Sequence, residues 1–418
     1  MAAPRSLSLA AYRALTRRGA APRLPKYPPR PDGELAWIHL GTNQDMRALL
    51  DLAERLHQTR EPLTVLLTRT AEDETTPWPK HTSADHLVFA TAPNEHPDAV
   101  AAFLDHWNPD VGLWVWGALR PNLVDISTAR GVPLHLVSAD KAGFDGQSYR
   151  WLPELSRHLG GCFLSASARS ASSAQRLARI GVPPERIIVL PPLRPSGRIL
   201  PCAQSDQDEM AQQLKGRPVW LAAEILSGEY PAIIEAHRQA IRSAHRLLLV
   251  INPTNTNDIQ DITEMLERAG LTHTTWGNGT YPKETTQVLI ADCPDELGLW
   301  YRIASVSFLG GSLVVGHGGR DPMVAASLGT AILYGPNIGA HLGSYARLAQ
   351  AGAARIVKDA STLSNSVVRL IAPDLSATMA HAGWDVVTEG AEIVDGVIDL
   401  VQDSLDERLA EKAKASVS

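Results

Sequence analysis

Short apolar segments alternate with amphipathic segments along most of the chain. The apolar runs are nearly continuous, which is typical of strands buried on both faces of a parallel sheet covered by helices. After one of these runs, Val100, Phe103, Leu104 and Trp107 repeat at the spacing of one helix face. The repetition predicts an α/β fold with doubly wound parallel sheets. The apolar runs of the first series are 35–40, 63–68, 86–91, 111–116, 132–137 and 162–167.

The alternation is interrupted once, after the apolar run 186–190, by a segment rich in proline and polar residues. This composition is typical of a linker. We therefore expect two Rossmann-like domains that face a cleft, with ligands at the carboxyl ends of the strands. The second series of apolar runs is 218–224, 246–251, 287–292, 305–311, 330–335 and 354–359. The expected parts are a basic N-terminal segment 1–33, a first domain 34–194, a linker 195–216 and a second domain 217–418.

Charge is distributed unevenly over the 418 residues. The chain carries 39 Lys and Arg against 45 Asp and Glu, a net charge of −6. Seven of the cations and no acid lie in the first thirty residues, so the remainder has a clear acidic excess. A nucleic-acid-binding protein normally has a basic body, and nucleic acid is therefore not an expected partner.

The basic N-terminal segment has two interpretations. A short helix can place apolar side chains on an anionic membrane surface and its arginines at the lipid headgroups. A solvated basic tail is the simpler alternative. The apolar side chains of the first interpretation are Leu7, Leu9, Tyr12 and Leu15, and the arginines are Arg13, Arg17 and Arg18.

Cysteine usage and hydropathy indicate the compartment. Cys162, Cys202 and Cys293 lie far apart without a CxxC spacing, which favours a reducing compartment and no structural zinc. No apolar run reaches the roughly 18 residues of a membrane span. The N-terminus also lacks the apolar core and cleavage site of a secretory signal. These features predict a cytoplasmic protein.

The common nucleotide and hydrolase motifs GxGxxG, GxxxxGK[ST], GxSxG and HExxH do not occur. What remains is a glycine-rich turn after the apolar run 305–311, followed by a second glycine-rich loop and a helical pattern. A strand, a glycine loop and a helix N-terminus form an anion site, because unpaired backbone N–H groups and the helix dipole face the ligand. Glycines that only let the chain turn are the alternative. The expected site residues are Gly310, Gly311, Ser312, Gly318, Gly319, Asp321 and Pro322.

Two blocks carry a family resemblance. The segments DELGLWYRIASVSFLGGSLV (295–314) and HGGRDPMVAASLGTAILYGPN (317–337) resemble the 3-deoxy-D-manno-octulosonate (Kdo) transferases of glycosyltransferase family 30. These enzymes attach Kdo from CMP-Kdo to lipid A precursors. Further segments match in family order, at 10–17, 37–39, 103–124, 130–137, 215–223 and 227–238.

The resemblance implies a GT-B fold, in which the first domain binds the lipid acceptor and the second binds the CMP-sugar as co-substrate. No other cofactor and no metal are implied. It also implies a cytoplasmic protein held peripherally at the inner membrane, since the family usually carries an N-terminal membrane helix that is shortened here. Two-domain periplasmic-type binding proteins share the tandem layout, but the missing export signal disfavours them.

The resemblance assigns two catalytic residues. The family's general base falls at Asp45, where a carboxylate accepts the proton of the attacking hydroxyl. Helix N-capping is an equally good interpretation of Asp45. A family lysine that stabilises charge on the donor falls at Arg194, which keeps the cation but not the geometry of an ammonium. A family segment that contacts the nucleotide falls at Asp295, Glu296 and Leu297.

Several family positions are replaced. The acceptor-side motif Glu-Ser-Glu-Leu-Trp-Pro-Asn is 116–122 here, without its glutamates. The phosphate-binding arginine of Pro-Arg-His-Pro is absent from 252–255, and the ribose-binding glutamate of Asn-Pro-x-Glu is Val324. The family's Asn-Ala-Arg is Ser-Ala-Asp at 138–140. Three hypotheses follow: a transferase with an altered donor or acceptor, an inactive paralogue that binds lipid or a partner protein, and an unrelated sugar-binding module.

Overall fold

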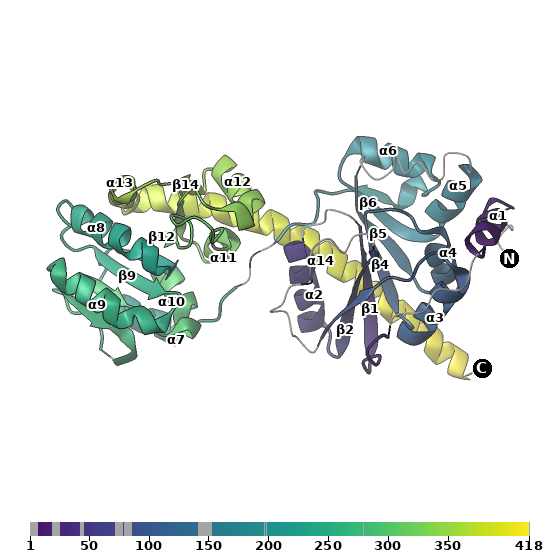
Figure 1. Ribbon diagram of the computed structural model, residues 1–418, viewed down its shortest axis with the longest axis horizontal. Coiled ribbons are helices and arrows are strands. Elements are labelled where there is room, and N and C mark those ends of the chain that lie inside the picture. The colour runs from purple at the N-terminus through teal and green to yellow at the C-terminus, as the bar shows by residue number, and fades with distance from the viewer. Residues whose placement is uncertain are drawn as a thin grey trace. The chain divides into compact units, whose positions relative to one another are not determined.

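The computed structural model describes residues 7–18, 26–41, 46–71, 78, 86–140, 153–195, 197, 199–278 and 280–417. The chain divides into two compact units (Figure 1). Unit 1 comprises Met1–Arg194 and Glu392–Ser418, and unit 2 comprises Pro195–Ala391. Each unit is built on a seven-stranded parallel sheet, as the apolar runs predicted.

The sheet of unit 1 has the order β3-β2-β1-β4-β5-β6-β7. Ala36 of the interior strand β1 pairs with Val65 on one side and with Val111 on the other, both in parallel register. The strand order reverses between β1 and β4, which makes their carboxyl ends the topological switch point where ligands bind in such sheets. The strands are β1 Glu34–Leu40, β2 Leu63–Arg69, β3 Leu87–Thr91, β4 Val111–Val115, β5 Leu134–Ala139, β6 Phe163–Ala168 and β7 Ile187–Val189.

Helices cover both faces of this sheet (Figure 1). The predicted helix around Val100 and Trp107 is α3, whose buried face includes both residues. The helices that precede the second unit are α1 Leu7–Thr16, α2 Met46–Thr59, α3 Pro97–Trp107, α4 Pro121–Ala129, α5 Pro153–Gly161, α6 Ala171–Arg179 and the 3-10 turn η3 Pro184–Arg186.

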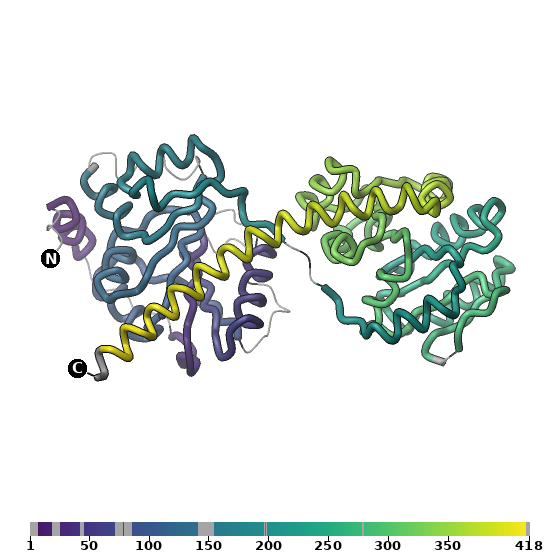
Figure 2. The backbone as a smooth tube through the Cα atoms, turned by 180° about the vertical axis from the view of Figure 1, so that it is seen from behind, coloured from purple at the N-terminus to yellow at the C-terminus, as the bar shows by residue number. Residues whose placement is uncertain are grey.

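The C-terminal helix α14, Pro373–Val417, completes unit 1 with its second half. Figure 2 shows this yellow segment lying across the strands of the unit. Its apolar side chains, among them Val394 and Val401, are buried against Ala36 and Ile38 of β1. Polar contacts add to this packing: His135 bonds Ser404 at 2.8 Å, and Lys412 pairs with Asp110 at 2.8 Å.

The sheet of unit 2 has the order β10-β11-β9-β8-β12-β13-β14, with its switch point between β8 and β12. Its strands are β8 Val219–Ile225, β9 Leu248–Pro253, β10 His273–Thr275, β11 Val288–Ile290, β12 Val306–Leu309, β13 Ala331–Tyr334 and β14 Ala354–Ile356. Its helices are α7 Gln204–Leu214, α8 Tyr230–Ala240, α9 Ile259–Arg268, α10 Leu297–Ile303, α11 Pro322–Ser327, α12 Leu342–Gln350, α13 Ala360–Leu370 and the first part of α14. Its 3-10 turns are η4 Ser227–Glu229, η5 Thr256–Asp258, η6 Trp276–Asn278, η7 Pro294–Glu296 and η8 Gly339–His341.

The observed boundaries differ from the expected ones in two respects. The segment expected as the linker 195–216 contains α7, whose Met210 and Leu214 are buried in the core of unit 2. The segment from Glu392 onward groups with unit 1 and not with the second domain. Local composition does not reveal either feature. Helix α7 and the second half of α14 are both stabilised by tertiary packing, which a local pattern of proline and polar residues does not report.

The expected membrane face of α1 is only partly available. Leu9 is buried, and the partly buried Tyr12 bonds Glu95 at 3.3 Å. Arg13 pairs with Asp125, so this cation serves the fold of unit 1. Leu7 and Leu15 remain exposed, by 82% and 51%. Within the described part of the chain, no helix combines the length and the apolar character that a membrane crossing requires.

Candidate functional site

The glycine-rich turn of unit 2 lies at its topological switch point, directly after β12. A Cβ on Gly310 would lie 2.3 Å from the carbonyl oxygen of Glu224 at the end of β8, so only glycine fits this approach. Gly311 has a φ of +66°, in the left-handed region that favours glycine. The two glycines therefore have a geometric reason that is independent of any ligand.

The backbone amides of this turn bind a carboxylate of the chain itself. Glu229 is fully buried in η4, and its carboxylate accepts hydrogen bonds from the amides of Gly311 at 2.7 Å, Ser312 at 3.1 Å and Leu313 at 2.9 Å. A fourth bond comes from the amide of Leu226 at 3.1 Å. The turn thus binds an anion of the chain itself, and these donors serve Glu229 and are not free for a phosphate.

Ser312 fixes the neighbouring loop. Its buried hydroxyl donates to the carbonyl of Leu309 at 2.5 Å and accepts from the amide of Gly335, after β13, at 2.8 Å. Its carbonyl accepts from the amide of Asn337 at 2.9 Å. Ser312 therefore ties the carboxyl ends of β12 and β13 together, which is a structural role.

The second glycine-rich loop returns to the first. Gly318 and Gly319 both have positive φ, 76° and 78°, and the amide of Gly319 donates to the carbonyl of Gly311 at 3.0 Å. Asp321 caps α11 by accepting from the amide of Met323 at 3.0 Å, and Pro322 occupies the first turn. The amide of Met323, at the helix N-terminus that was expected to face a ligand, therefore donates to the carboxylate of Asp321.

A cation does lie at this edge of the sheet. Arg320 donates to the hydroxyl of Thr254 at 2.7 Å and lies 3.8 Å from the carboxylate of Glu224. Its side chain is 30% exposed. Thr254 follows β9 directly, next to Pro253, where the family resemblance places the phosphate-binding arginine. Glu224 itself has a φ of +49°, which is unusual for a residue other than glycine and is found at functional sites.

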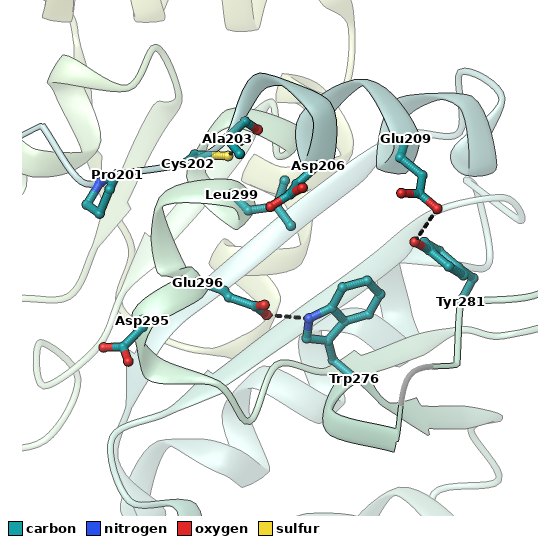
Figure 3. Close-up of a pocket in the computed structure, with 10 residues that line it drawn as sticks. All are labelled: Pro201, Cys202, Ala203, Asp206, Glu209, Trp276, Tyr281, Asp295, Glu296 and Leu299. Atoms are coloured by element: carbon teal, nitrogen blue, oxygen red, sulfur yellow. Dashed lines mark hydrogen bonds between the residues drawn. The ribbon is translucent and has the colours of Figure 1, made fainter.

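Asp295 and Glu296 line a separate pocket of about 380 Å³ in unit 2 (Figure 3). Glu296 accepts a hydrogen bond from the indole of Trp276, and Glu209 accepts one from the hydroxyl of Tyr281 at 2.6 Å. The rings of Trp276 and Tyr281 meet edge to face, with centroids 5.4 Å apart. The expected contact residue Leu297 begins α10 and does not line the pocket.

The pocket is electrostatically negative. Its lining residues are Pro201, Cys202, Ala203, Asp206, Glu209, Trp276, Tyr281, Asp295, Glu296 and Leu299, which include four acids and no base. The hydrogen bond to Glu209 raises the pKa of Tyr281. Burial, with the neighbouring carboxylate of Glu296, likewise raises the pKa of the Cys293 thiol. Such a pocket accepts N–H donors and aromatic rings, whereas it repels a phosphate.

In unit 1, the carboxylate of Glu95 contacts the segment 116–122, in which the two family glutamates are replaced. Glu95 follows β3 and accepts from the amide of Asn122 at 2.8 Å, and it lies 3.5 Å from Arg120. Burial raises the pKa of Glu95, although the charge of Arg120 opposes this effect. One carboxylate oxygen of Glu95 and one guanidinium nitrogen of Arg120 are buried without a hydrogen bond. The sequence analysis did not single out Glu95, because Glu95 follows β3 whereas the segment 116–122 follows β4.

Of the two expected catalytic residues, the structure describes Arg194 and not Asp45. Asp45 lies outside the described residues, in the gap between Gly41 and α2. Gly41 belongs to the switch point of unit 1, because a Cβ there would lie 1.9 Å from the carbonyl oxygen of Trp116 after β4. Arg194 is half-buried and is the last residue of unit 1, beyond β7.

The fold and this site define a class of protein. Two Rossmann-like parallel sheets, each with its loops gathered at a switch point, are the GT-B architecture of glycosyltransferases. Residues 14–196 match the family described as 3-deoxy-D-manno-octulosonic-acid transferase (kdotransferase). The chain is similar to the Kdo transferases, by this family model within its first half and by curated relatives over most of its length.

Curated relatives match most of the chain at low identity. A 3-deoxy-D-manno-octulosonic acid transferase of Haemophilus influenzae is 23% identical over 90% of this chain and 88% of its own length. The enzyme of the same name from Bordetella pertussis is 28% identical over 87% of this chain and 86% of its own length.

Two solved structures are similar to the chain at low TM-scores. The C-terminal CMP-Kdo binding domain of WaaA from Acinetobacter baumannii is 23% identical, covers 46% of this chain and 96% of its own length, and has a TM-score of 0.41. MurG from Acinetobacter baumannii is 12% identical, covers 89% of this chain and 100% of its own length, and has a TM-score of 0.47.

Proposed function

We propose that the chain is a glycosyltransferase that moves Kdo, or a related acidic sugar, from a CMP-sugar to a lipid A precursor in lipopolysaccharide biosynthesis. Similarity to the Kdo transferase family supports the reaction class. The observation that carries the proposal for this chain is the position of Arg320, whose guanidinium lies on Thr254 at the carboxyl end of β9.

Arg320 replaces the lost phosphate-binding arginine in this proposal. The family arginine falls at Pro253, and Arg320 reaches the next residue from a different loop. A guanidinium that forms charge-assisted hydrogen bonds to a phosphate contributes about 1.5–3 kcal/mol each, enough for micromolar binding when other contacts add to it. Since Glu229 occupies the amides of the glycine turn, a side-chain cation is the donor that a CMP phosphate requires here.

The remaining roles follow the family pattern. Asp45 is proposed as the base that accepts the proton of the acceptor hydroxyl, and Arg194 as the cation that stabilises charge developing on the donor. The pocket beside Glu296 suits the N–H groups of a nucleobase, since carboxylates accept from exocyclic amines and Trp276 offers a ring for stacking. No metal and no other cofactor enter this scheme.

The part of α1 that is available for a membrane is smaller than the sequence predicted, because Leu9 is buried. Leu7 and Leu15 are the exposed apolar side chains of α1, and Arg17 and Arg18 are exposed just beyond it. Together they suit the surface of an anionic membrane, the inner membrane in a cell that makes lipid A. The protein is then cytoplasmic and peripheral.

One observation favours a second candidate. The amides that the resemblance led us to expect at a donor phosphate are occupied by Glu229, which suits a non-catalytic paralogue that binds lipid or a partner protein. The two candidates differ in whether the chain turns over a CMP-sugar.

A transfer assay separates them. The purified full chain is incubated with CMP-Kdo and a lipid A precursor, and both CMP release and the glycosylated lipid are measured, the latter by mass spectrometry. Lipid product formed by the wild type and lost in Arg320→Gln, but kept in the surface control Arg268→Gln, supports the proposal. The absence of product with wild-type protein that still binds vesicles favours the paralogue.

A further inference from the structure

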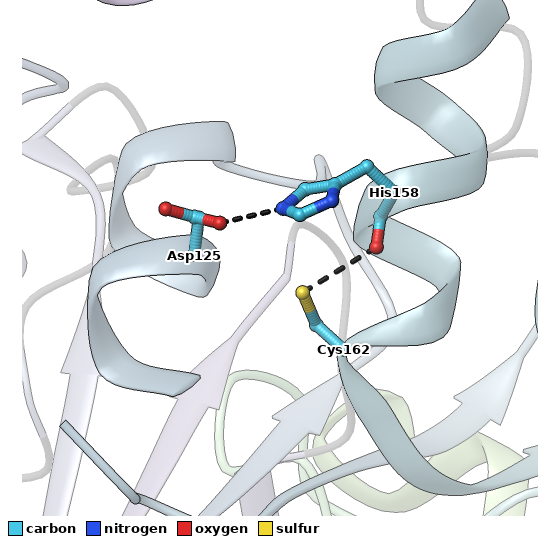
Figure 4. A group of neighbouring side chains, drawn as sticks. All are labelled: Asp125, His158 and Cys162. Atoms are coloured by element: carbon cyan, nitrogen blue, oxygen red, sulfur yellow. Dashed lines mark hydrogen bonds and ion pairs between the residues drawn. The ribbon is translucent and has the colours of Figure 1, made fainter. Parts of the chain in front are cut away.

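Three side chains of unit 1 bring different metal-binding atoms together, apart from the site described above (Figure 4). Asp125 comes from α4, His158 from the last turn of α5, and Cys162 lies one residue beyond the end of that helix. The carboxylate oxygen, the imidazole nitrogen and the sulfur all lie within 4.8 Å of one another. Among the residues that the structure describes, this is the one group of at least three His, Cys or acidic side chains whose ligand atoms lie this close together.

The atoms already face one another. His158 Nε2 lies 2.6 Å from Asp125 Oδ1, so the edge of the imidazole that would bind a metal points at the carboxylate. His158 and Cys162 are four residues apart, a spacing that places two side chains on the same face at a helix end. Cys162 donates to the carbonyl of His158 at 3.4 Å, which holds its sulfur beside the same turn.

A second contact orients the carboxylate. Arg13 of α1 pairs with Asp125 Oδ2, the oxygen that His158 does not use. A metal at Oδ1 therefore leaves the pair with Arg13 intact, and a hydrogen-bonded partner on the free oxygen is what metal-binding carboxylates commonly have. The side chains of Asp125 and His158 are 14% and 24% exposed, so an ion can reach them from solvent.

We propose that Asp125, His158 and Cys162 bind one divalent transition metal of the zinc class. One thiolate, one imidazole and one carboxylate are the ligand types that Zn²⁺ prefers, and three protein ligands leave a fourth position for water. Binding forms a metal–sulfur, a metal–nitrogen and a metal–oxygen bond and releases the thiol proton to solvent. Burial raises the pKa of Cys162 to about 11, so the metal has to displace that proton, and affinity falls as pH falls.

The site links three helices of unit 1. Since Arg13 belongs to α1, Asp125 to α4 and His158 to α5, an ion bound here fixes the packing of α5 on α4 and keeps the carboxylate in place for α1. The proposed role is structural, independent of the sugar-transfer site, and its test does not use enzyme activity.

Cobalt(II) is the probe. The full chain is stripped with a chelator and titrated with Co²⁺, whose bond to a thiolate gives a charge-transfer band and whose tetrahedral sites give strong visible bands. We expect one equivalent to bind, Zn²⁺ to bleach the spectrum, and Cys162→Ser to abolish the charge-transfer band. The matched controls Cys202→Ser and Cys293→Ser remove the other two half-buried thiols and should keep the band.

Variants of the other two ligands extend the test. His158→Gln and Asp125→Asn should each weaken Co²⁺ binding more than about tenfold while the charge-transfer band survives at saturation. Circular dichroism checks that each variant is folded. A wild-type chain without the band, or a Cys162→Ser variant that keeps it, overturns the proposal, and the first outcome needs no variant to fold.

Discussion

The carboxylate of Glu229 accepts a 2.7 Å hydrogen bond from the backbone amide of Gly311, at the switch point of unit 2. In a nucleotide-binding protein this amide commonly faces a phosphate. Here the chain supplies its own anion, which is fully buried and also binds the next two amides. The turn after β12 is therefore preformed without ligand, and substrate charge has to be met by side chains.

Replacing this carboxylate should destabilise the protein. In Glu229→Gln the amide side chain keeps one acceptor but turns an NH₂ group toward backbone donors that lose their partner. We expect a loss of about 2–4 kcal/mol in the free energy of unfolding of unit 2, since these are buried bonds to a charged group. Urea denaturation measures it. The control Glu264→Gln removes an exposed partner of Arg268 and should change the free energy by less than about 0.5 kcal/mol.

Arg320 is expected to bind the phosphate of the donor. Arg320→Gln should weaken CMP binding by roughly 10- to 150-fold, which corresponds to the loss of one charge-assisted hydrogen bond of about 1.5–3 kcal/mol. Isothermal titration calorimetry measures this change, with the exposed Arg268→Gln as control. Equal CMP affinity in Arg320→Gln and in the wild type would exclude Arg320 from the donor site.

Asp45 is expected to act as the base. Asp45→Asn should lower the transfer rate by about 10²- to 10⁴-fold, because the amide cannot accept the hydroxyl proton. Asn caps a helix about as well as Asp, so the melting temperature should stay the same. The exposed Asp261→Asn serves as a control for the loss of one negative charge. Unchanged transfer by Asp45→Asn would leave Asp45 with the capping role alone.

The sequence predicted most strands because their apolar runs are buried on both faces, which leaves little ambiguity. It missed β10, His273–Thr275, whose three residues are half-buried and polar. The helical face of Val100 and Trp107 was likewise predictable from spacing alone. Helix α7 was not predicted because most of its residues are polar and exposed. Only Met210 and Leu214 of its eleven residues are buried, too few to give an apolar pattern.

The site was harder to predict than the fold. Glycines 310 and 311 were recognised, but periodicity does not tell whether a turn holds a ligand or a neighbouring side chain. Glu229 was not singled out in the sequence, because its contact with Gly311 joins segments 82 residues apart. Arg320 and Thr254 are 66 residues apart for the same reason. Long-range pairing of this kind has no local signal.

Stability should depend on pH through His135. Burial lowers its pKa to about 4, below the ordinary value of 6.5, so the unfolded chain binds more protons between these values. The stabilising contribution is complete above pH 6.5 and is lost as pH falls toward 4, by up to about 3 kcal/mol. Urea denaturation across this range measures the slope, to which the buried His39 and His237 also contribute, because burial lowers the pKa of each to about 3.

Substitution isolates the share of His135. His135→Gln should reduce the slope of stability against pH between pH 6.5 and 4 by the contribution of one histidine, at the cost of the bonds to Ser165 and Ser404. His245→Gln replaces an exposed histidine and should leave the slope as it is. A wild-type slope retained in His135→Gln would assign the effect to other groups.

Membrane binding should depend on the exposed part of α1. We expect the protein to float with anionic vesicles at low salt and to be released as salt rises, because the attraction of Arg17 and Arg18 is screened. Replacing both by Gln should weaken binding by about 2 kcal/mol, at about 1 kcal/mol per residue. Leu7→Ser removes an apolar contact, and Leu9→Ser, a buried position, reports on folding instead. Salt-independent flotation with neutral vesicles would contradict the electrostatic account.

The long helix α14 has a consequence for synthesis. Unit 1 is discontinuous along the chain: its sheet is encoded by the residues before Pro195, but part of the apolar cluster that packs on β1 comes from the segment after Ala391. All of unit 2 leaves the ribosome between these two parts. Unit 2 can therefore finish folding first, whereas the sheet of unit 1, although translated earlier, keeps part of one apolar face uncovered until Val394 and Val401 emerge. Nascent chains that stop after unit 2 would expose that face to chaperones.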